Sequence, residues 1–334
     1  MKNTERHFHS RLALTEGQTT QNSVDFPLNK LITAIWLRIG FTVTVTSQGS
    51  NYVAATNAVL SFIRNIQLKT SNNGLAVNAP GAALYYRAAM LLGQLPSIST
   101  TYTPNTPGAY AMSVCVPLLF ADPRMLRPED TLIDMSRETG MDLFVTLGAG
   151  TDGVCAGVGS GSTFAISAAT CDIEIESIAG APRDSVRPYF FQQISVEGSP
   201  KNVASDVTAQ LTRSSDRLLK RVFLFAGNGG AISRPFSGAG SLLIVDTASF
   251  GDGRQYYDKN RYAAQIADEN QAAYQVAAQT GLYVLDYVKD ASNFSAIPTG
   301  DKSELKLEWV NSASLPGTLL NSVSVVSETL NKLK

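Results

Sequence analysis

A glycine-rich stretch is the part of this sequence that comes closest to a known chemical motif. Residues 148–153 read Gly-Ala-Gly-Thr-Asp-Gly, directly after a strand-like stretch, Met141–Leu147, and Asp172 follows about 20 residues later, as a dinucleotide-binding motif requires. In such a motif the last glycine opens a helix whose N-terminus meets the pyrophosphate. Here more glycines and another strand-like stretch follow instead. We therefore predict a loop and no cofactor.

Histidine chemistry is confined to the start of the chain, because its two histidines are His7 and His9. This excludes Ser-His-Asp and Cys-His catalysis, and the multi-histidine metal site of a cupin, from the rest of the chain. Asp172, Glu174 and Glu176 alternate along one strand-like stretch, where a cation or a glycosidase-like acid could sit. Carboxylates on a solvated strand face are the more common case. We predict no catalytic residues, no metal site and no enzyme activity.

The densest basic cluster comprises Arg213, Arg217, Lys220 and Arg221, with Asp216 inside it. A nucleic-acid site would need more positive charge and interleaved aromatic side chains. Over the whole chain, 27 Lys and Arg residues face 28 Asp and Glu residues, which gives a net charge of −1. We predict that the cluster forms a solvated rim or salt bridges between subunits, and that the chain does not bind nucleic acid directly.

The three cysteines, Cys115, Cys155 and Cys171, are odd in number and lack CxxC spacing, so we expect free thiols rather than disulfides or a zinc ribbon. Met1–Arg11 lacks the apolar stretch of a signal peptide. We predict instead an N-terminal arm over residues 1–12, whose basic side chains could contact neighbouring subunits or anionic lipid head groups. No run reaches about 18 consecutive apolar residues, so we expect no membrane-spanning segment.

The composition favours a globular chain with large contact surfaces. At about 150 residues per domain, 334 residues suggest two domains. Hydrophobic residues make up 44% of the chain, whereas charged residues make up 16%, against about 25% in an average soluble domain. Much of the surface must therefore carry uncharged polar side chains, which suits extensive contact with other protein.

Most segments alternate apolar and polar residues with period two, as half-buried strands do. Met141–Leu147 and Leu305–Trp309 are clear examples. Two stretches have helical periodicity instead, Gly81–Leu92 and Asp258–Gln279. Pro80 and Gly93 mark the start and the end of the first. The pattern indicates a mainly β protein with two inserted helices.

A weak internal repeat appears when the chain is compared with itself, since each half presents the same elements in the same order. The best match pairs Leu31–Gly40 with Leu218–Gly227. The other pairs are Leu14–Gly17 with Ser195–Gly198, Ile63–Lys69 with Leu242–Asp246, Tyr85-Tyr86 with Tyr256-Tyr257, Val114–Val116 with Leu282–Val284, Asp122 with Asp290, Asp142-Leu143 with Glu304-Leu305, and Cys171–Ile175 with Val323–Ser327. Loop insertions explain the drift in spacing, because loop length costs little stability.

The repeat predicts an all-β fold of two tandem eight-stranded antiparallel jelly rolls, a double jelly roll, with a short helix inserted in each. A single large sandwich is the alternative. Gly, Pro and charged residues interrupt the strand pattern at Ile178–Tyr189. We therefore place the first jelly roll at 13–182 and the second at 183–334. We also expect Trp36 and Phe223 at equivalent, inward-facing positions.

The order of these elements resembles a known family. The strand Leu218–Gly227 (LLKRVFLFAG), the helices with paired tyrosines, and Gly281–Asp290 (GLYVLDYVKD) followed by Ser303–Trp309 (SELKLEW) are similar to the double jelly-roll major capsid proteins of tailless icosahedral bacteriophages with an internal membrane. The resemblance is architectural and covers nearly all the chain. It implies a homotrimeric, pseudo-hexameric capsomer that tiles a virion shell over a membrane. It also implies penton or minor capsid proteins and membrane lipids as partners, and assembly in the host cytoplasm.

A different function remains open from the residues alone. A jelly roll can also serve as a carbohydrate-binding or adhesion module, in which exposed aromatic side chains form a shelf for a sugar. Tyr256, Tyr257 and Trp309 are the candidates for such a shelf. Their alternation with polar residues favours a place in the core instead.

Overall fold

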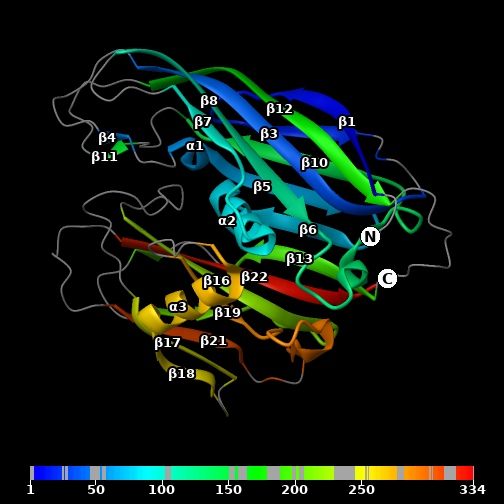
Figure 1. Ribbon diagram of the computed structural model, residues 1–334, viewed down its shortest axis with the longest axis vertical. Helices are drawn as coiled ribbons and strands as arrows, with labels where there is room; N and C mark the ends of the chain where they lie inside the picture. Colours follow the sequence, from blue (N-terminus) through cyan, green and yellow to red (C-terminus); the bar gives the residue numbers. More distant parts are fainter. Residues whose placement is uncertain are drawn as a thin grey trace.

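The chain was analysed as a computed structural model, which describes residues 4–24, 26, 29–45, 53–54, 58–101, 107–149, 155–156, 164–178, 189–197, 201–202, 207–228, 245–252, 254, 256–276, 282–300, 302, 304–311 and 321–333. Within these ranges, no helix is both long enough and apolar enough to cross a membrane. The fold consists of two halves stacked along the long axis of the molecule (Figure 1).

Eight main strands in two facing sheets, with the short strands β7 and β9 beside them, form the first half. Sheet 1 has the order β1-β12-β3-β8-β7, and β9 also pairs with β3. The strands of sheet 1 are β1 (Thr4–Ala13), β12 (Phe164–Ile178), β3 (Leu31–Val45), β8 (Gly108–Leu119), β7 (Ile98–Thr100) and β9 (Ile133–Asp134). The facing strands are β2 (Thr19–Val24), β10 (Met141–Leu147), β5 (Ile63–Thr70) and β6 (Gly74–Ala79), in the order β2-β10-β5-β6. With β1, β12, β3 and β8 as one sheet, this is the strand order of a jelly roll.

The second half repeats that order. One of its sheets runs β13-β22-β16-β19 and the other, sheet 3, runs β15-β21-β17-β18. The strands are β13 (Phe190–Val196), β22 (Asn321–Lys332), β16 (Arg217–Asn228), β19 (Leu282–Asp286), β15 (Val207–Gln210), β21 (Lys306–Asn311), β17 (Val245–Gly251) and β18 (Tyr256–Tyr262). Short strands complete the set: β4 (Val53–Ala54), β11 (Cys155–Ala156), β14 (Lys201–Asn202) and β20 (Ile297–Pro298). The predicted double jelly-roll class is confirmed.

One continuous sheet, sheet 2, joins the halves. Strand β13 of the second half pairs in parallel with β6 of the first, through Ile194 with Val77 and Ser195 with Asn78. The strands β2, β10, β5, β6, β13, β22, β16 and β19 thereby line up as one sheet across the middle of the molecule (Figure 1). The boundary that we predict near residue 182 falls in 179–188, outside the described residues, and stays a prediction.

The helices agree in part with the sequence analysis. α2 (Gly81–Leu92) has the predicted bounds and ends at Gly93, whose positive φ of 70° suits glycine. α3 (Ala263–Tyr274) begins later than predicted, because Asp258 to Tyr262 belong to β18. A short α1 (Ala58–Ser61) and two 3-10 turns, Pro128–Thr131 and Asn293–Ser295, complete the helical segments of the described chain.

The predicted N-terminal arm is, from Thr4 onward, an edge strand. β1 pairs antiparallel with β12 from Thr4 with Ile178 to Ala13 with Thr170, so residues 4–12 belong to the first jelly roll rather than to a separate arm. The error has a physical cause. An edge strand needs few apolar residues and commonly carries charges that discourage edge-to-edge pairing, so its sequence looks like that of a polar tail.

The repeat holds at the level of strand register. In the first half Ala34 on β3 lies opposite Glu176 on β12, and in the second half Arg221 on β16 lies opposite Glu328 on β22. Both pairs follow from the sequence match of the corresponding strands. On the next strand Cys115 of β8 corresponds to Leu282 of β19, one residue away from the predicted partner.

Trp36 and Phe223 are equivalent, as predicted, but they do not face the interior of their jelly rolls. Strand β3 turns Ile35 and Leu37 inward and Trp36 to the outer face of sheet 1, where it is half-buried. Phe223 is buried with 2% exposure, in a cluster shared with the first half, while its neighbours Val222 and Leu224 line the core of the second half. Trp36 and Phe223 thus lie on the side of their strands that packs on other elements rather than on the core of their own jelly roll.

Gly81 gives a stability test of this packing. A Cβ at Gly81 would lie 2.5 Å from Ile63 Cγ2, although alanine generally favours helices. We expect Gly81→Ala to lower the free energy of unfolding by about 1–3 kcal/mol, as overpacking does. Gly140→Ala is the control, because nothing lies within 4 Å of its Cβ position. Urea denaturation measures both variants, and a Gly81→Ala chain as stable as the unchanged chain would contradict the packing described.

Candidate functional site

Two members of the predicted basic cluster are buried. Lys220 and Arg221 on β16 have 0% and 1% of their surface exposed. Arg213, in contrast, is exposed, and Arg217 is half-buried and donates to Gln193. The prediction of a solvated rim is therefore wrong for Lys220 and Arg221. Buried charges persist in proteins where opposite charges pair with them.

Asp122, from the loop after β8 in the first half, pairs with both of these cations. Its Oδ2 atom lies 2.8 Å from Nζ of Lys220 and 2.8 Å from Nη1 of Arg221. Nε of Arg221 also lies 3.1 Å from Oδ2 of Asp286 on β19. A carboxylate of one half is thus held by two cations of the other.

Glu328 on β22 makes the reverse contact, in which a carboxylate of the second half is bound by a cation of the first. It is fully buried, and Arg87 of α2 donates to its two carboxylate oxygens from Nη2 at 3.1 Å and from Nε at 3.2 Å. Arg87 also donates from Nη1 to the carbonyl of Leu119 at 3.0 Å. Nζ of Lys220 lies 3.4 Å from the Oε1 atom of Glu328. Two-point pairing of this kind fixes orientation as well as charge.

We call Arg87, Asp122, Lys220, Arg221, Asp286 and Glu328 the interface ion cluster; it sets three cations against three carboxylates. Burial alone would raise the pKa of Asp122, but the charges of Arg221 and Lys220 outweigh it and hold that pKa well below its usual range. Burial likewise opposes ionisation of Glu328, and Arg87, Lys220 and Arg221 hold its pKa low. These carboxylates stay ionised at neutral pH, which suits a structural pairing rather than proton transfer.

A cation–aromatic contact joins the halves beside the ion cluster. The guanidinium carbon of Arg124, in the first half, lies 4.5 Å from the ring centre of Tyr274 on α3, and Arg124 donates to the carbonyl of Ala273. The Tyr274 hydroxyl donates to Asp286, so it extends the same network. Burial raises the pKa of Tyr274, which keeps this hydroxyl protonated.

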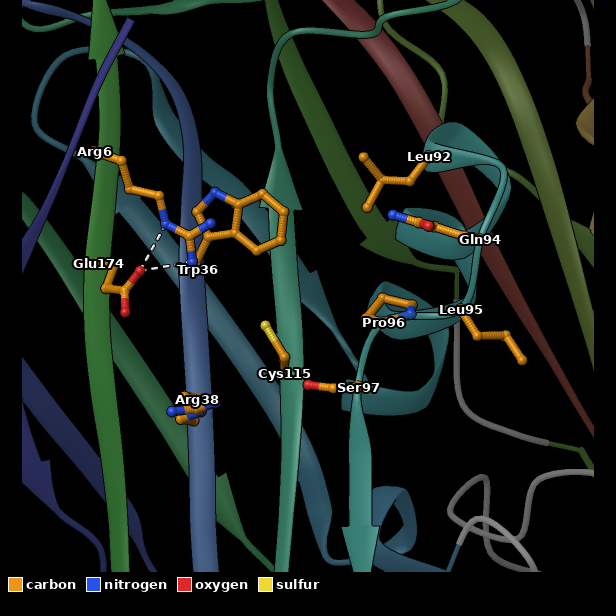
Figure 2. A pocket seen from close by; sticks show the side chains of 10 residues that line it. All are labelled: Arg6, Trp36, Arg38, Leu92, Gln94, Leu95, Pro96, Ser97, Cys115 and Glu174. Atoms are coloured by element: carbon orange, nitrogen blue, oxygen red, sulfur yellow. Dashed lines mark hydrogen bonds and ion pairs between the residues drawn. The ribbon is translucent and has the colours of Figure 1, made fainter.

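The equivalent face of the first half, the outer face of sheet 1, carries an open groove of about 410 Å³ (Figure 2). Trp36 and Arg38 from β3 and Cys115 from β8 line its floor. On one side, Arg6 of β1 stacks 4.2 Å from the Trp36 ring centre and pairs with Glu174 at 2.6 Å. Leu92, the last residue of α2, and residues 94–97 after the helix form the other side.

The three acidic residues of β12 lie on this outer face, as their alternation predicts, and each has a partner. Asp172 accepts from Arg11, and Glu174 pairs with Arg6. Glu176 accepts from the Trp36 indole nitrogen at 3.2 Å. In the part of the chain that is described, no group of three or more His, Cys, Asp or Glu side chains is arranged to hold a metal ion.

The other chemically interesting residues are dispersed. His7 and His9 lie on β1, and the His9 ring stacks on Phe26 with 5.1 Å between the ring centres. Cys171 is a buried free thiol whose pKa burial raises to about 12, so it is a poor nucleophile. Of the glycine-rich motif, residues 150–153 lie outside the described residues, and so does the side chain of Cys155.

The aromatic residues considered for a sugar shelf do not form one in the described part of the chain. Tyr256 is 53% exposed, but Tyr257 packs against Phe250 with 5.6 Å between ring centres. The side chain of Trp309 lies outside the described residues.

Sequence reasoning did not identify Arg87, Asp286 and Glu328 as partners of the basic cluster, although signals for two of them exist. Arg87 is a lone charge in the otherwise uncharged helix Gly81–Leu92, and Glu328 follows the uncharged, valine-rich stretch Val323–Ser327. A single charge within an apolar element commonly has an opposite charge nearby, because an unpaired buried charge is costly.

The interface ion cluster predicts an acid-dependent stability. Glu328→Gln keeps the side-chain shape but leaves Arg87 and Lys220 buried without that negative charge, so we expect a loss of about 3–5 kcal/mol in the free energy of unfolding at pH 7. Because the folded pKa values of Asp122 and Glu328 lie below the ordinary 3.8 and 4.5, the stability they provide is present above about pH 5 and falls as the pH drops further.

Urea denaturation at pH 7, 5 and 3 measures both effects. The unchanged chain should lose stability between pH 5 and pH 3, and Glu328→Gln should show a shallower loss. Glu5→Gln is the control, because the Glu5–Lys30 pair is solvent-accessible and contributes at most about 1 kcal/mol. A Glu328→Gln chain with unchanged stability would show that the cluster does not hold the halves together.

Comparisons with known proteins show which solved structures share this architecture. No family model matches the chain, and no curated protein matches it by sequence. Among solved structures, the STIV MCP, from Sulfolobus Turreted Icosahedral Virus, superposes with a TM-score of 0.64 at 14% identity over 99% of this chain and 96% of that chain. The major capsid protein P2 from Bacteriophage PM2 gives 0.59 at 11% identity, over 99% and 98%. The Faustovirus major capsid protein gives 0.62 at 9% identity, over 99% and 90%. The chain therefore has the double jelly-roll fold that these viral capsid proteins share.

Proposed function

We propose that this chain is the major capsid protein of an icosahedral virus, a structural subunit that assembles with copies of itself into the virion shell. The observation that carries the proposal is the end-to-end match of the fold. The chain superposes on the major capsid protein P2 from Bacteriophage PM2 over 99% of its length and 98% of that chain, a span that includes both jelly rolls. A match over one jelly roll alone would support many unrelated functions.

The contact between the halves supports the same proposal. The interface ion cluster and the continuous sheet 2 tie the two jelly rolls into one block, so the chain can act as a tile of fixed shape. Two related domains in one chain imitate a dimer, and threefold closure of that pair gives six similar units around an axis. We propose a homotrimer of this kind, with the boundary between the two jelly rolls at residues 182 and 183 and with β1 included in the first.

Further details of the proposal follow the resemblance of the sequence. The trimers tile a shell over an internal membrane, with penton or minor capsid proteins and membrane lipids as partners, after assembly in the host cytoplasm. The role is structural and needs no catalytic residue or cofactor. The low charged fraction of 16% supports it, because uncharged polar surfaces lose less hydration energy when they are buried between subunits.

The experiment that tests the proposal is a mass measurement on the purified full chain. Size-exclusion chromatography with light scattering should give three times the single-chain mass of 35.7 kDa. Electron microscopy of the concentrated protein should show capsomer-sized rings or closed shells. A chain that stays at 35.7 kDa at high concentration and forms no particles would contradict the proposed function.

A further inference from the structure

The chain has two open faces that correspond to two faces it buries within itself. We propose that the outward face of α3 in one copy packs into the groove on the outer face of sheet 1 in a second copy. This contact would repeat between chains the contact that α2 of the first half makes with β22 of the second, through Arg87 and Glu328. It rests on the proposed capsid function and names the surfaces that join its subunits.

The two helices are equivalent. Each has 12 residues, each lies between the same two strands of its jelly roll, and each ends at a residue in the left-handed conformation, Gly93 or Gln275. In both, the backbone N–H of that end residue bonds to the carbonyl four residues earlier, Ala89 or Gln271. Residue 81 of α2 therefore corresponds to residue 263 of α3.

The helices α2 and α3 differ in how much of their surface is buried. Every residue of α2 from Gly81 to Leu91 is buried. In α3, the side chains of Ile266 and Asn270 are buried on the second half, and that of Tyr274 is buried beside Arg124 of the first half. The opposite side of the helix carries a second stripe, whose residues each lie two positions before one of the buried residues. This stripe is exposed and consists of Ala264, Asp268 and Ala272.

The stripe of α2 that corresponds to this exposed stripe shows what such a face can contact. Ala82, Tyr86 and Met90 belong to a buried cluster that includes Phe223 and Val326 of the second half. Arg87, next on the helix, reaches Glu328 on the same sheet. In α2 this side is buried, and in α3 it is exposed.

The face of β16 and β22 and the outer face of sheet 1 also differ in burial. Arg221 and Phe223 on β16, with Glu328 on β22, are almost completely buried against the first half. The register places Ala34, Trp36 and Glu176 at the corresponding positions of sheet 1. There Trp36 is half-buried and borders the open groove, whose walls include Leu95 with 50% exposure. The groove therefore marks the place of a missing helix.

The chemistry of the two open faces is complementary. Trp36, Leu92 and Pro96 give the groove an apolar lining, and the small side chains of Ala264 and Ala272 allow close approach of a helix. Arg38 at the groove lies opposite Asp172, which already pairs with Arg11, and Asp268 lies on the exposed helix stripe. Their opposite charges suit a pairing across the interface.

Such a contact is head-to-tail, since it joins two different faces, and it can close into a ring. Two variants separate the faces. The groove variant Leu95→Arg/Ser97→Arg places two exposed, bulky cations at the groove, and the helix variant Ala264→Arg/Ala272→Arg does the same on α3. The control is Gln21→Arg/Gln210→Arg, which changes exposed positions on the edge strands β2 and β15.

Light scattering of the full-length chains measures the result. The groove variant and the helix variant should each fall to 35.7 kDa, and the control should keep the oligomeric mass of the unchanged chain. A one-to-one mixture of the two variants should give twice 35.7 kDa, because the intact helix of one fits the intact groove of the other and the pair cannot extend. Circular dichroism and thermal melting check that each variant is folded.

Several outcomes would overturn the inference while the proposed function stands. One is an unchanged oligomer for either variant, and another is a mixture that stays at single-chain mass. An unchanged chain that is itself monomeric would defeat the proposed function as well.

If a variant does not fold, a cross-linking experiment replaces it. Chains that carry both Ser97→Cys and Asp268→Cys are made in ¹⁴N and in ¹⁵N cultures, mixed, and cross-linked through their thiols. Cross-linked peptides of mixed isotope composition are expected, and their absence in a fully oligomeric sample would contradict the contact.

Discussion

The pairing of buried charges across the two halves is the constraint on which the rest of the structure depends. Lys220 and Arg221 are carried by the second half, and Asp122 and Arg87 by the first. If the halves separated, Arg87 and Glu328 would lose their main partners, and water would have to solvate charges now packed among apolar side chains. Docking therefore requires one relative position of the halves, since a shift of a few ångströms would break several ion pairs together. The parallel pairing of β13 with β6 adds backbone hydrogen bonds at the same boundary.

Because of this constraint, the two halves bury different surfaces and leave different surfaces open. The first half contributes the buried helix α2, and the second half contributes the sheet face whose Glu328 pairs with Arg87 of that helix. What remains open is the sheet face of the first half and the helix of the second. A duplicated domain that uses one pair of surfaces internally retains the other pair for a neighbour. In the proposed assembly, the fold thereby supplies both a rigid subunit and the surfaces that join it to the next.

Much of the fold follows from local pattern, whereas the ion cluster does not. Alternation along β3, β10 and β12, together with the collinear repeat, predicts the jelly-roll strands, because core strands must keep their register. The bounds of α2 follow from Pro80 and Gly93. Lys220 and Arg221 look like surface residues because Asp122 lies 98 and 99 residues away in sequence. Pairing over that distance leaves no local signal. The start of α3 was missed for a related reason: its first predicted residues pair with β17 through tertiary contact.

The claim that the ion cluster makes one unit of the two jelly rolls is tested most directly by differential scanning calorimetry of the full chain. A single unfolding transition is expected when neither half is stable without the contact. Glu328→Gln should split or broaden that transition, since it weakens the contact without altering the core of either half. Two well-separated transitions in the unchanged chain would contradict the account, because they would show that each jelly roll unfolds independently of its neighbour.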